Sequence, residues 1–527
     1  MKTWRIKSIG LIFFVNFVWS LWAEHIIFVH TNDSHGYFYP RKEKDKEIYG
    51  PLALYAHLAA IRIEAAQKKA FVILTHGGDI NTGTPESDLV YAKPDIEIMN
   101  HLGFTVTTLG NHEFDIPRRE LERQMEQSYF RWLAANIEKK NGERLAAPVL
   151  LLELGRIRLG ILGLITQSTE KISVPQNIRD LIFEDPVRIA RYYTEELRKK
   201  ADMVVVLSHL GFYPAEKEQQ LKYKGDIAIA KNVRGIDLIL GGHSHSLVIN
   251  ENIEGVPIYQ ADSYYRYAVR VDFEVNPGEK PRLLSHRVLS LAEFPVEWAK
   301  IKELDPYRTE YRRLEEIIQN ALKTSEKLFS RVIAQSEDDF LHDRTTLFHQ
   351  SVPIGNLIAD AQRQFTQADI GIVNSGGIRA GLDKGPILLR ELYTICPFRN
   401  TVGTIELKGS EIRELFRLLL MRKENGHFPQ ISGAEVHFNR DNHTVRVYLR
   451  KDGTYVPIKS NQVYKVSLNS YLAAGGNDYP DIVTKSRFHD TGMKDSEILQ
   501  KFLEQRGVVR SQDFAEKRIR FFRLRRP

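Results

Sequence analysis

Five short blocks rich in His, Asp and Asn occur within the first 250 residues of the chain. Their side chains are imidazoles, carboxylates and amides, with no thiolate, and such ligands suit Zn, Mn, Co or Fe. Any one block is typical of an ordinary turn, but five of the same chemical kind indicate a shared site. They offer more ligands than one tetrahedral ion needs, which suits two ions that share a bridging carboxylate. The blocks are His30–Gly36, Thr75–Asp79, Gly110–Asp115, Ser208–Gly211 and Gly241–His245.

Each block follows a short apolar run that is typical of a buried strand. Amphipathic stretches lie between several of these runs, at Leu52–Lys69, Pro186–Lys200 and Ala215–Val233. This alternation predicts a layered α/β domain over residues 24–290. The blocks would then meet at the carboxyl edge of the sheet, where α/β proteins bind ligands. The predicted strands are Ile26–Val29, Phe71–Leu74, Thr105–Leu109, Leu159–Ile165, Met203–Leu207 and Ile236–Leu240.

A second mixed α/β domain is expected over residues 331–527. It contains a helical stretch at Gly355–Phe365, a Gly-rich loop at Asn374–Ile378 and a strand-like run at Val445–Leu449. Residues 291–330 between the domains are charged and helical in pattern, and we interpret them as a linking helix. Alternatively, they form the first helix of the second domain. Their apolar stripe at helical spacing comprises Leu304, Tyr307, Tyr311, Leu314, Ile317, Ile318 and Leu322.

The first 23 residues have the pattern of a secretory signal peptide. Lys2, Arg5 and Lys7 precede an apolar stretch from Ile9 to Trp22, and Ala23 is a small residue at which cleavage is expected. A cut after Ser20 is an alternative, and an uncleaved membrane anchor is another. We therefore expect an exported protein, periplasmic or extracellular, with no stable membrane anchor after cleavage.

Composition excludes several classes of protein. With 43% hydrophobic and 27% charged residues in 527, the chain is neither disordered, nor collagen-like, nor a polytopic membrane protein. The single cysteine, Cys396, excludes an internal disulfide and a Cys-based zinc cluster. The net charge of +7 is small for this length. We interpret the basic stretch Lys517–Pro527 as a final strand with a solvated tail and expect no nucleic-acid partner.

These blocks resemble the calcineurin-like metallophosphoesterases, and nearly all of the chain beyond the signal peptide resembles the exported 5′-nucleotidases. That family includes bacterial periplasmic nucleotidase/UDP-sugar hydrolases. The resemblance implies a metallophosphoesterase domain followed by a nucleotide-binding domain. The matching pieces of the second half are Gly355–Asp360, Asn374–Arg379, Pro397-Phe398, Asn469-x-Tyr471 and Gly475-Gly476.

The resemblance also implies a role for each residue of the first domain. One divalent ion would be held by Asp33, His35 and His245, and Asp79 would bridge to a second. The implied ions are Zn, Mn or Co, and a metal-bound hydroxide would attack phosphorus. The implied ligands of the second ion are Asn111, His209 and His243. His112 would not bind metal; it would act on the transition state or the leaving oxygen, and Asp115 would orient it.

In the second domain, the resemblance implies that Phe398 and Tyr471 sandwich the base and that Arg379 pairs with phosphate. The implied substrate-binding set also includes Asn356, Asn374 and Asp478. The sequence departs from the family pattern at two places that concern the substrate. The run Gln350–Ile354 replaces the polar or basic residues usual in the family. After the glycines, either Asn477 or Asp478 takes the place of the usual Asp.

The expected function is metal-dependent hydrolysis of nucleoside 5′-phosphates to nucleoside and phosphate. One alternative is the same chemistry on 2′,3′-cyclic nucleotides or UDP-sugars. Another is a nucleotide-binding protein without catalysis, which the intact set of candidate ligands argues against. The oligomeric state is left open by the sequence.

Overall fold

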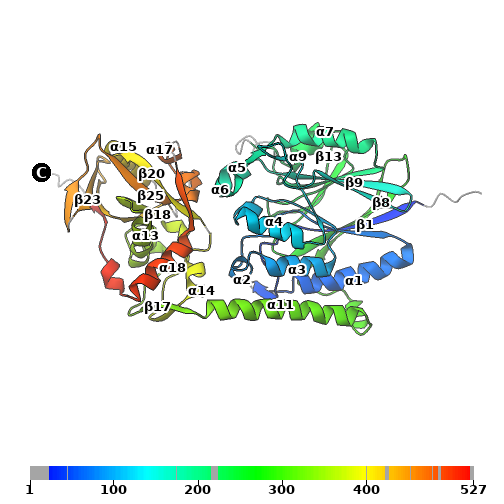
Figure 1. Ribbon diagram of the computed structural model, residues 1–527, viewed down its shortest axis with the longest axis horizontal. Coiled ribbons are helices and arrows are strands. Elements are labelled where there is room, and N and C mark those ends of the chain that lie inside the picture. The colour runs from blue at the N-terminus through cyan, green and yellow to red at the C-terminus, as the bar shows by residue number, and fades with distance from the viewer. Residues whose placement is uncertain are drawn as a thin grey trace, which may run out of the picture.

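The computed structural model describes residues 23–43, 46–173, 175–214, 223–398, 400–421, 427–451, 453–476, 479–484 and 488–522. They form two α/β lobes, and the long helix α11 (Tyr307–Phe329) runs along the N-terminal lobe and ends at the C-terminal lobe (Figure 1). Nearly all of the predicted signal peptide, and Asp478, lie outside these residues. Within them, no helix is long and apolar enough to cross a membrane.

The N-terminal lobe contains two six-stranded sheets. The first sheet has the order β16 (Arg282–Ser290), β15 (Tyr267–Val275), β1 (Glu24–Thr31), β4 (Phe71–His76), β5 (Val106–Thr108), β6 (Arg131–Leu133). The second has the order β13 (Leu247–Ile253), β14 (Val256–Ala261), β12 (Leu238–Leu240), β11 (Met203–His209), β9 (Ile157–Ile165), β8 (Val149–Leu154). The strands β1, β4, β5 and β6 run parallel, as do β9, β11, β12 and β14.

The two sheets pack face to face because their inner strands are apolar on both sides. In β1, Ile26 and Phe28 belong to the core between the sheets, whereas Ile27 and Val29 belong to the core under the helices. Successive side chains of a strand point to opposite faces, so one continuous apolar run supplies both cores. The helices that cover the outer faces are α1 (Pro51–Lys68) and α3 (Lys93–Leu102) on the first sheet, and α7 (Pro186–Arg198) and α9 (Asp226–Asn232) on the second.

This arrangement confirms the predicted layered α/β class, with one difference. The five His- and Asp-rich blocks end strands of two sheets, three in the first and two in the second, and do not share a single sheet edge. Periodicity along a strand predicts its burial but does not predict its neighbours, which explains the difference.

The C-terminal lobe is built around a five-stranded mixed sheet. Helix α13 (Pro353–Thr366) and helix α18 (Asp495–Arg506) share one core against it, and helix α15 (Gly409–Met421) belongs to the core of the other face. The predicted helix at 355–365 therefore forms. The order of this sheet is β21 (Pro429–Ser432), β18 (Ile370–Asn374), β25 (Val463–Asn469), β20 (Thr401–Lys408), β26 (His489–Lys494).

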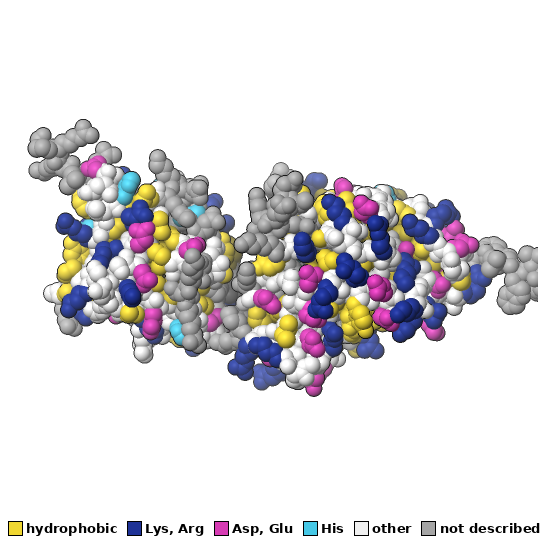
Figure 2. Space-filling model, turned by 90° about the horizontal axis from the view of Figure 1, so that it is seen from above, with side chains coloured by type: hydrophobic (Ala, Val, Ile, Leu, Met, Phe, Trp, Pro, Cys, Tyr) yellow, Lys and Arg dark blue, Asp and Glu magenta, His cyan; other side chains and the backbone are white. Residues whose placement is uncertain are grey.

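Two smaller sheets complete the C-terminal lobe. The predicted run 445–449 forms part of a four-stranded sheet with the order β24 (Thr454–Pro457), β23 (Val445–Lys451), β22 (Ala434–Asn439), β28 (Ile519–Phe522). The other has the order β19 (Gly385–Leu388), β17 (Val332–Ser336), β27 (Val508–Val509). Seen from above, Lys and Arg are interspersed with Asp and Glu over the N-terminal lobe (Figure 2).

Helix α11 packs the predicted apolar stripe on the N-terminal lobe. Leu314 and Ile318 are buried there, but Leu304 lies before the helix and is half exposed. Near the end of the helix, Ser325 Oγ donates to the carbonyl oxygen of Glu86 at 3.2 Å. Phe329, the last residue of α11, meets Tyr393 of α14 (Leu389–Ile395) with ring centroids 5.8 Å apart. The helix therefore contacts both lobes.

We predict that the buried stripe of α11 stabilises the N-terminal lobe. Leu314→Ala should lower its free energy of unfolding by about 2–5 kcal/mol, because truncation of a fully buried Leu leaves a cavity. Leu328→Ala on the same helix, at a side chain 42% exposed, should change it by less than about 0.5 kcal/mol. Urea unfolding followed by the fluorescence of Trp298, whose ring lies 4.9 Å from that of Tyr311, measures both. Equal effects of the two variants would contradict the prediction.

Candidate active site

Seven polar side chains meet between the carboxyl ends of the two sheets. Five of the seven have a positive φ, between 49° and 78°, which is costly for residues with a side chain. The sharp backbone turns direct the side chains inward from loops that begin in different sheets. The residues are Asp33 and His35 after β1, Asp79 after β4, Asn111 after β5, His209 at the end of β11, and His243 and His245 after β12.

The first group of ligand atoms comes from Asp33, His35, Asp79 and His245, which lie within 4.8 Å of one another. His35 Nδ1 donates to the carbonyl oxygen of Thr82 at 2.6 Å, so its Nε2 carries the lone pair. That Nε2 lies 3.1 Å from Nε2 of His245 and 3.7 Å from Oδ2 of Asp79. Lone pairs and carboxylate oxygens this close repel one another unless a cation lies between them. The donor set therefore fits a divalent ion.

The second group shares Asp79 with the first and adds His209 and His243. His209 Nδ1 donates to the carbonyl oxygen of Gly77 at 2.6 Å. Its Nε2 lies 3.0 Å from Oδ2 of Asp79 and 3.2 Å from Oδ1 of Asn111. Burial lowers the pKa of His209, but the Asp79 carboxylate outweighs it and raises the pKa to about 9. A proton held between these two groups occupies the position that an ion would take.

Two of the imidazoles are neutral at physiological pH. Burial lowers the pKa of His35 to about 4 and that of His243 to about 3. Neutral imidazole is the form of histidine that binds metal. Each group therefore holds one histidine that is ready to bind.

Two glycines allow the loops to approach this closely. A Cβ on Gly110 would lie 2.2 Å from Oδ1 of Asp79, and one on Gly242 would lie 2.6 Å from the carbonyl oxygen of Gly77. Any side chain at either position would push a ligand loop aside. Gly242 follows a strand of the second sheet and Gly77 a strand of the first, so the two sheets touch at the site.

His112 lies beside the ligands but belongs to neither group. Its Nδ1 donates to Oδ2 of Asp115 at 2.6 Å, and its backbone N–H donates to Oδ1 of Asp79 at 2.9 Å. Burial lowers the pKa of His112, but the carboxylates of Asp115 and Asp79 outweigh it and raise the pKa to about 10. Because Nδ1 is engaged by Asp115, Nε2 is the nitrogen left to act on a substrate.

The predicted aromatic and arginine residues follow or precede strands at one end of the C-terminal sheet. Tyr471 follows β25, and Phe398 precedes β20, whose Val402 pairs with Asn469 at the end of β25. Phe398 is 53% exposed and Tyr471 is 44% exposed, so neither is a core residue. Arg379 Cζ lies 5.7 Å from the centroid of the Phe398 ring.

The two predicted asparagines are buried behind this edge. Asn374 Oδ1 accepts from Asn469 Nδ2 at 3.3 Å, which joins the ends of β18 and β25. Asn356 is fully buried in α13, and its Nδ2 donates to the carbonyl oxygens of Phe514 and Glu516 at 2.7 and 2.9 Å. The side chain of Asn356 therefore joins α13 to the C-terminal segment.

Known proteins share these two lobes in the same order. A family model for the calcineurin-like phosphoesterases matches residues 26–247, and one for the 5′-nucleotidase C-terminal domain matches 332–484. A 5′-nucleotidase of Vibrio parahaemolyticus is 31% identical over 92% of this chain and 90% of its own length. Protein UshA of Salmonella pullorum is 31% identical over 93% of both. The chain belongs to the 5′-nucleotidase family. The crystal structure of a 5′-nucleotidase precursor from Thermus thermophilus, 26% identical, matches with a TM-score of 0.60 over 95% of this chain and 100% of that one.

Family and geometry together establish the activity. This member of the family is a phosphoric ester hydrolase that hydrolyses nucleotides with the help of metal, and its Asp and His groups fit a two-metal site. The resemblance and the function expected from the sequence are confirmed.

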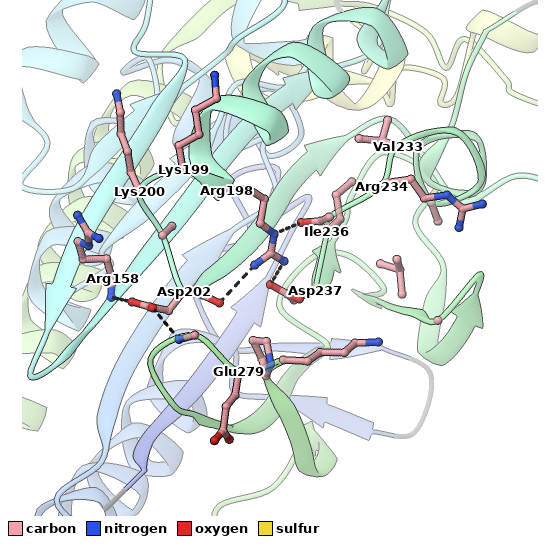
Figure 3. A pocket seen from close by; sticks show the side chains of 18 of the residues that line it. Arg158, Arg198, Lys199, Lys200, Asp202, Val233, Arg234, Ile236, Asp237 and Glu279 are labelled. Atoms are coloured by element: carbon pink, nitrogen blue, oxygen red, sulfur yellow. Dashed lines mark hydrogen bonds and ion pairs between the residues drawn. The ribbon is translucent and has the colours of Figure 1, made fainter. Parts of the chain in front are cut away.

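A second hollow on the N-terminal lobe lies at the opposite ends of the strands. It measures about 600 Å³ and is lined by Arg158 of β9 and by residues just before β11 and β12 (Figure 3). Arg198 bonds there to Asp237 and, through Nε, to the carbonyl oxygen of Gly235 at 2.7 Å. Lys199 and Lys200 point away from these groups in Figure 3. None of the ligand residues described above lines this hollow, so it is separate from the metal-ligand groups.

Sequence reasoning missed the residue that holds two ligand loops together. The carboxylate of Glu113 is fully buried and accepts the backbone N–H of Asp79 at 3.0 Å and that of Gly110 at 2.6 Å. It also accepts the N–H groups of Ile80 and Asn81, at 2.8 and 3.2 Å. The side-chain amide of Asn81 also donates to it at 3.2 Å, so five donors from two loops share this carboxylate. Its position directly after His112 was the available signal, because an acid with no assigned role stood inside a ligand block.

We predict that Glu113→Gln weakens binding of both ions by about 10- to 100-fold, the usual effect of losing a group that orients ligands. The Gln amide would present a donor where two backbone N–H groups need an acceptor. Glu120→Gln, at a buried acid of the neighbouring helix paired with Arg123, is the control and should bind metal normally. Metal titration of the chelator-treated proteins measures this, and parental affinity in Glu113→Gln would show that Glu113 only fills space.

Proposed function

We propose that this protein removes phosphate from nucleoside 5′-monophosphates at a site with two ions that share Asp79. The observation that supports this most strongly is the membership of Asp79 in both ligand groups. Nitrogen and oxygen ligands without thiolate suit Zn, Mn or Co, and elemental analysis of the purified protein identifies the metal. The proposed ligands are Asp33, His35, Asp79 and His245 for one ion, and Asp79, Asn111, His209 and His243 for the other.

Two divalent ions bound in this way supply an activated water and polarise the phosphoryl oxygens. The chain supplies the proton. We propose that His112 Nε2–H faces the ester oxygen and donates to it as the leaving alcohol departs. Asp115 accepts from Nδ1 and so fixes the ring and favours the protonated imidazole. His112 is therefore proposed as the catalytic acid and Asp115 as its positioning residue.

In the C-terminal lobe we propose that Phe398 and Tyr471 clamp the base. Both side chains are exposed at the same sheet edge, which supports a role outside the core. A Cβ on Gly476 would lie 2.5 Å from atoms of the Tyr471 ring, so glycine at this position lets the ring lie against the backbone. We propose that Arg379, beside Phe398, binds a phosphate oxygen, and that Asn374 supports the edge through Asn469.

We also propose that the protein is exported, to the periplasm or outside the cell. The support is the sequence of residues 1–23, in which basic residues precede an apolar stretch that ends at a small residue.

We predict that His112→Ala lowers kcat for AMP by about 10²- to 10⁴-fold while both ions stay bound, because His112 donates a proton and is not a ligand. The loss on p-nitrophenyl phosphate should be smaller, since its leaving group needs less protonation. His286→Ala, an exposed imidazole on β16, is the control and should match the parent. Equal loss on both substrates would mean that His112 stabilises phosphate charge, and loss of an ion would make it a ligand.

We predict that Phe398→Ala or Tyr471→Ala raises KM for AMP by about 5- to 150-fold, since stacking on a base contributes about 1–3 kcal/mol. Activity on p-nitrophenyl phosphate, which has no base, should change little. Phe365→Ala serves as the matched control, because this ring of the same lobe is 38% exposed and lies on α13. Folded variants that hydrolyse AMP like the parent would overturn the clamp.

A further inference from the structure

The four histidines of the metal site are oriented in two different ways. In His35 and His209, Nδ1 donates to a backbone carbonyl oxygen, the usual device that fixes a metal-binding imidazole. Among the described residues, neither His243 nor His245 makes such a bond through its second nitrogen. Both lie in the loop after β12, and the side chain of His245 is 34% exposed. Something other than a hydrogen bond must fix these two rings.

A tyrosine ring contacts the more exposed of the two. The ring of Tyr264 meets that of His245 edge to face, with centroids 5.2 Å apart and planes at 85°. It also contacts the ring of His35, at 5.5 Å and 61°. The backbone N–H of Tyr264 donates to the carbonyl oxygen of Asp33 at 2.7 Å. One residue therefore touches all three ligands that belong only to the first group.

Tyr264 is itself held in place. Its φ is +59°, an unusual conformation for a residue with a side chain. Arg41 Nη2 donates to its carbonyl oxygen at 2.7 Å, and Cζ of Arg266 lies 4.8 Å from its ring centroid. Arg266 Nε in turn donates to Glu43 at 2.7 Å, and the Tyr37 ring lies 4.5 Å from the Tyr264 ring. These contacts link Tyr264 to the β2–β3 hairpin (Arg41–Glu43 and Lys46–Ile48), which follows the ligand loop after β1 in the chain.

We propose that Tyr264 is a positioning residue for the ion held by Asp33, His35 and His245, and that its aromatic ring, not its hydroxyl, does this. This inference rests on the proposed two-ion site. The ring replaces the missing hydrogen bond of His245 by limiting the rotation of the imidazole. The ion in the second group does not depend on it, because the ring-to-ring contacts of Tyr264 among the described residues are with Tyr37, His35 and His245, and not with His209 or His243. The tyrosine ring that contacts His243 is that of Tyr213, at 6.3 Å.

The test is a calorimetric titration of chelator-treated protein with Mn²⁺. The parent should bind two ions. In Tyr264→Ala one dissociation constant should rise by about 10- to 100-fold and the other should stay unchanged, since this is the usual cost of losing a group that orients a ligand. Tyr264→Phe should bind like the parent, which a hydroxyl role would not allow. If Tyr264→Ala fails to fold, Arg266→Leu, which loosens the ring and leaves it present, should weaken the same ion to a smaller extent.

A double-mutant comparison identifies the ion concerned. Adding Tyr264→Ala to His245→Ala should cause no further loss, whereas adding it to His243→Ala should cause its full loss. Parental affinity for both ions in Tyr264→Ala, or equal weakening of both together with a lower melting temperature of the metal-free protein, would overturn the inference. A parent that binds fewer than two ions would instead overturn the proposed two-ion site.

Discussion

The carboxylate of Asp79 belongs to both ligand groups at once, and the N-terminal lobe is arranged around this constraint. Carboxylates and imidazole nitrogens lie about its Oδ2 in a buried space, where an unpaired charge is costly. Such a set is stable only with cations or protons between its members. The pKa of His209 is raised for this reason, because a proton on its imidazole offsets the charge of the Asp79 carboxylate. Metal affinity and the free energy of folding are therefore coupled here, since binding relieves a repulsion that the fold imposes.

The same constraint explains the backbone of the site. Ligands from two separate sheets can share one carboxylate only if their loops turn sharply, and the positive φ angles of Asp33, Asp79 and His243 are the result. This strain persists because other bonds fix the loops: the carboxylate of Glu113 collects N–H groups from two of them, and Asp33 N–H donates to the carbonyl oxygen of Gly78 at 3.0 Å. Catalytic geometry is thus maintained by backbone hydrogen bonds that involve no ligand atom.

The sequence was sufficient to predict the ligand types, the strands that precede them and the layered α/β class. His243 and His245 were recognisable because a strand, a glycine pair and two imidazoles follow one another. The split of the strands between two sheets was not predictable, since pairing is decided by contacts between distant segments. Tyr264 gave no local signal, because its partners Arg41 and Asp33 lie more than 200 residues away in the chain. Asn356 lies in a stretch that resembles a family motif, and its side-chain amide donates to the backbone carbonyl oxygen of Phe514 within the core.

Helix α11 connects the lobes as one uninterrupted element of 23 residues, about 34 Å long at 1.5 Å per residue. Its apolar stripe is fixed on the N-terminal lobe, and its last turn contacts α14 of the C-terminal lobe. A continuous helix fixes both the distance between the two lobes and the rotation of one lobe relative to the other about the helix axis. One residue added between Ile318 and Phe329 would turn everything beyond it by about 100° and shift it by about 1.5 Å. Evolution of this linker should therefore tolerate exchange of surface residues far more readily than insertion or deletion, because the two lobes keep their mutual orientation through its helical register.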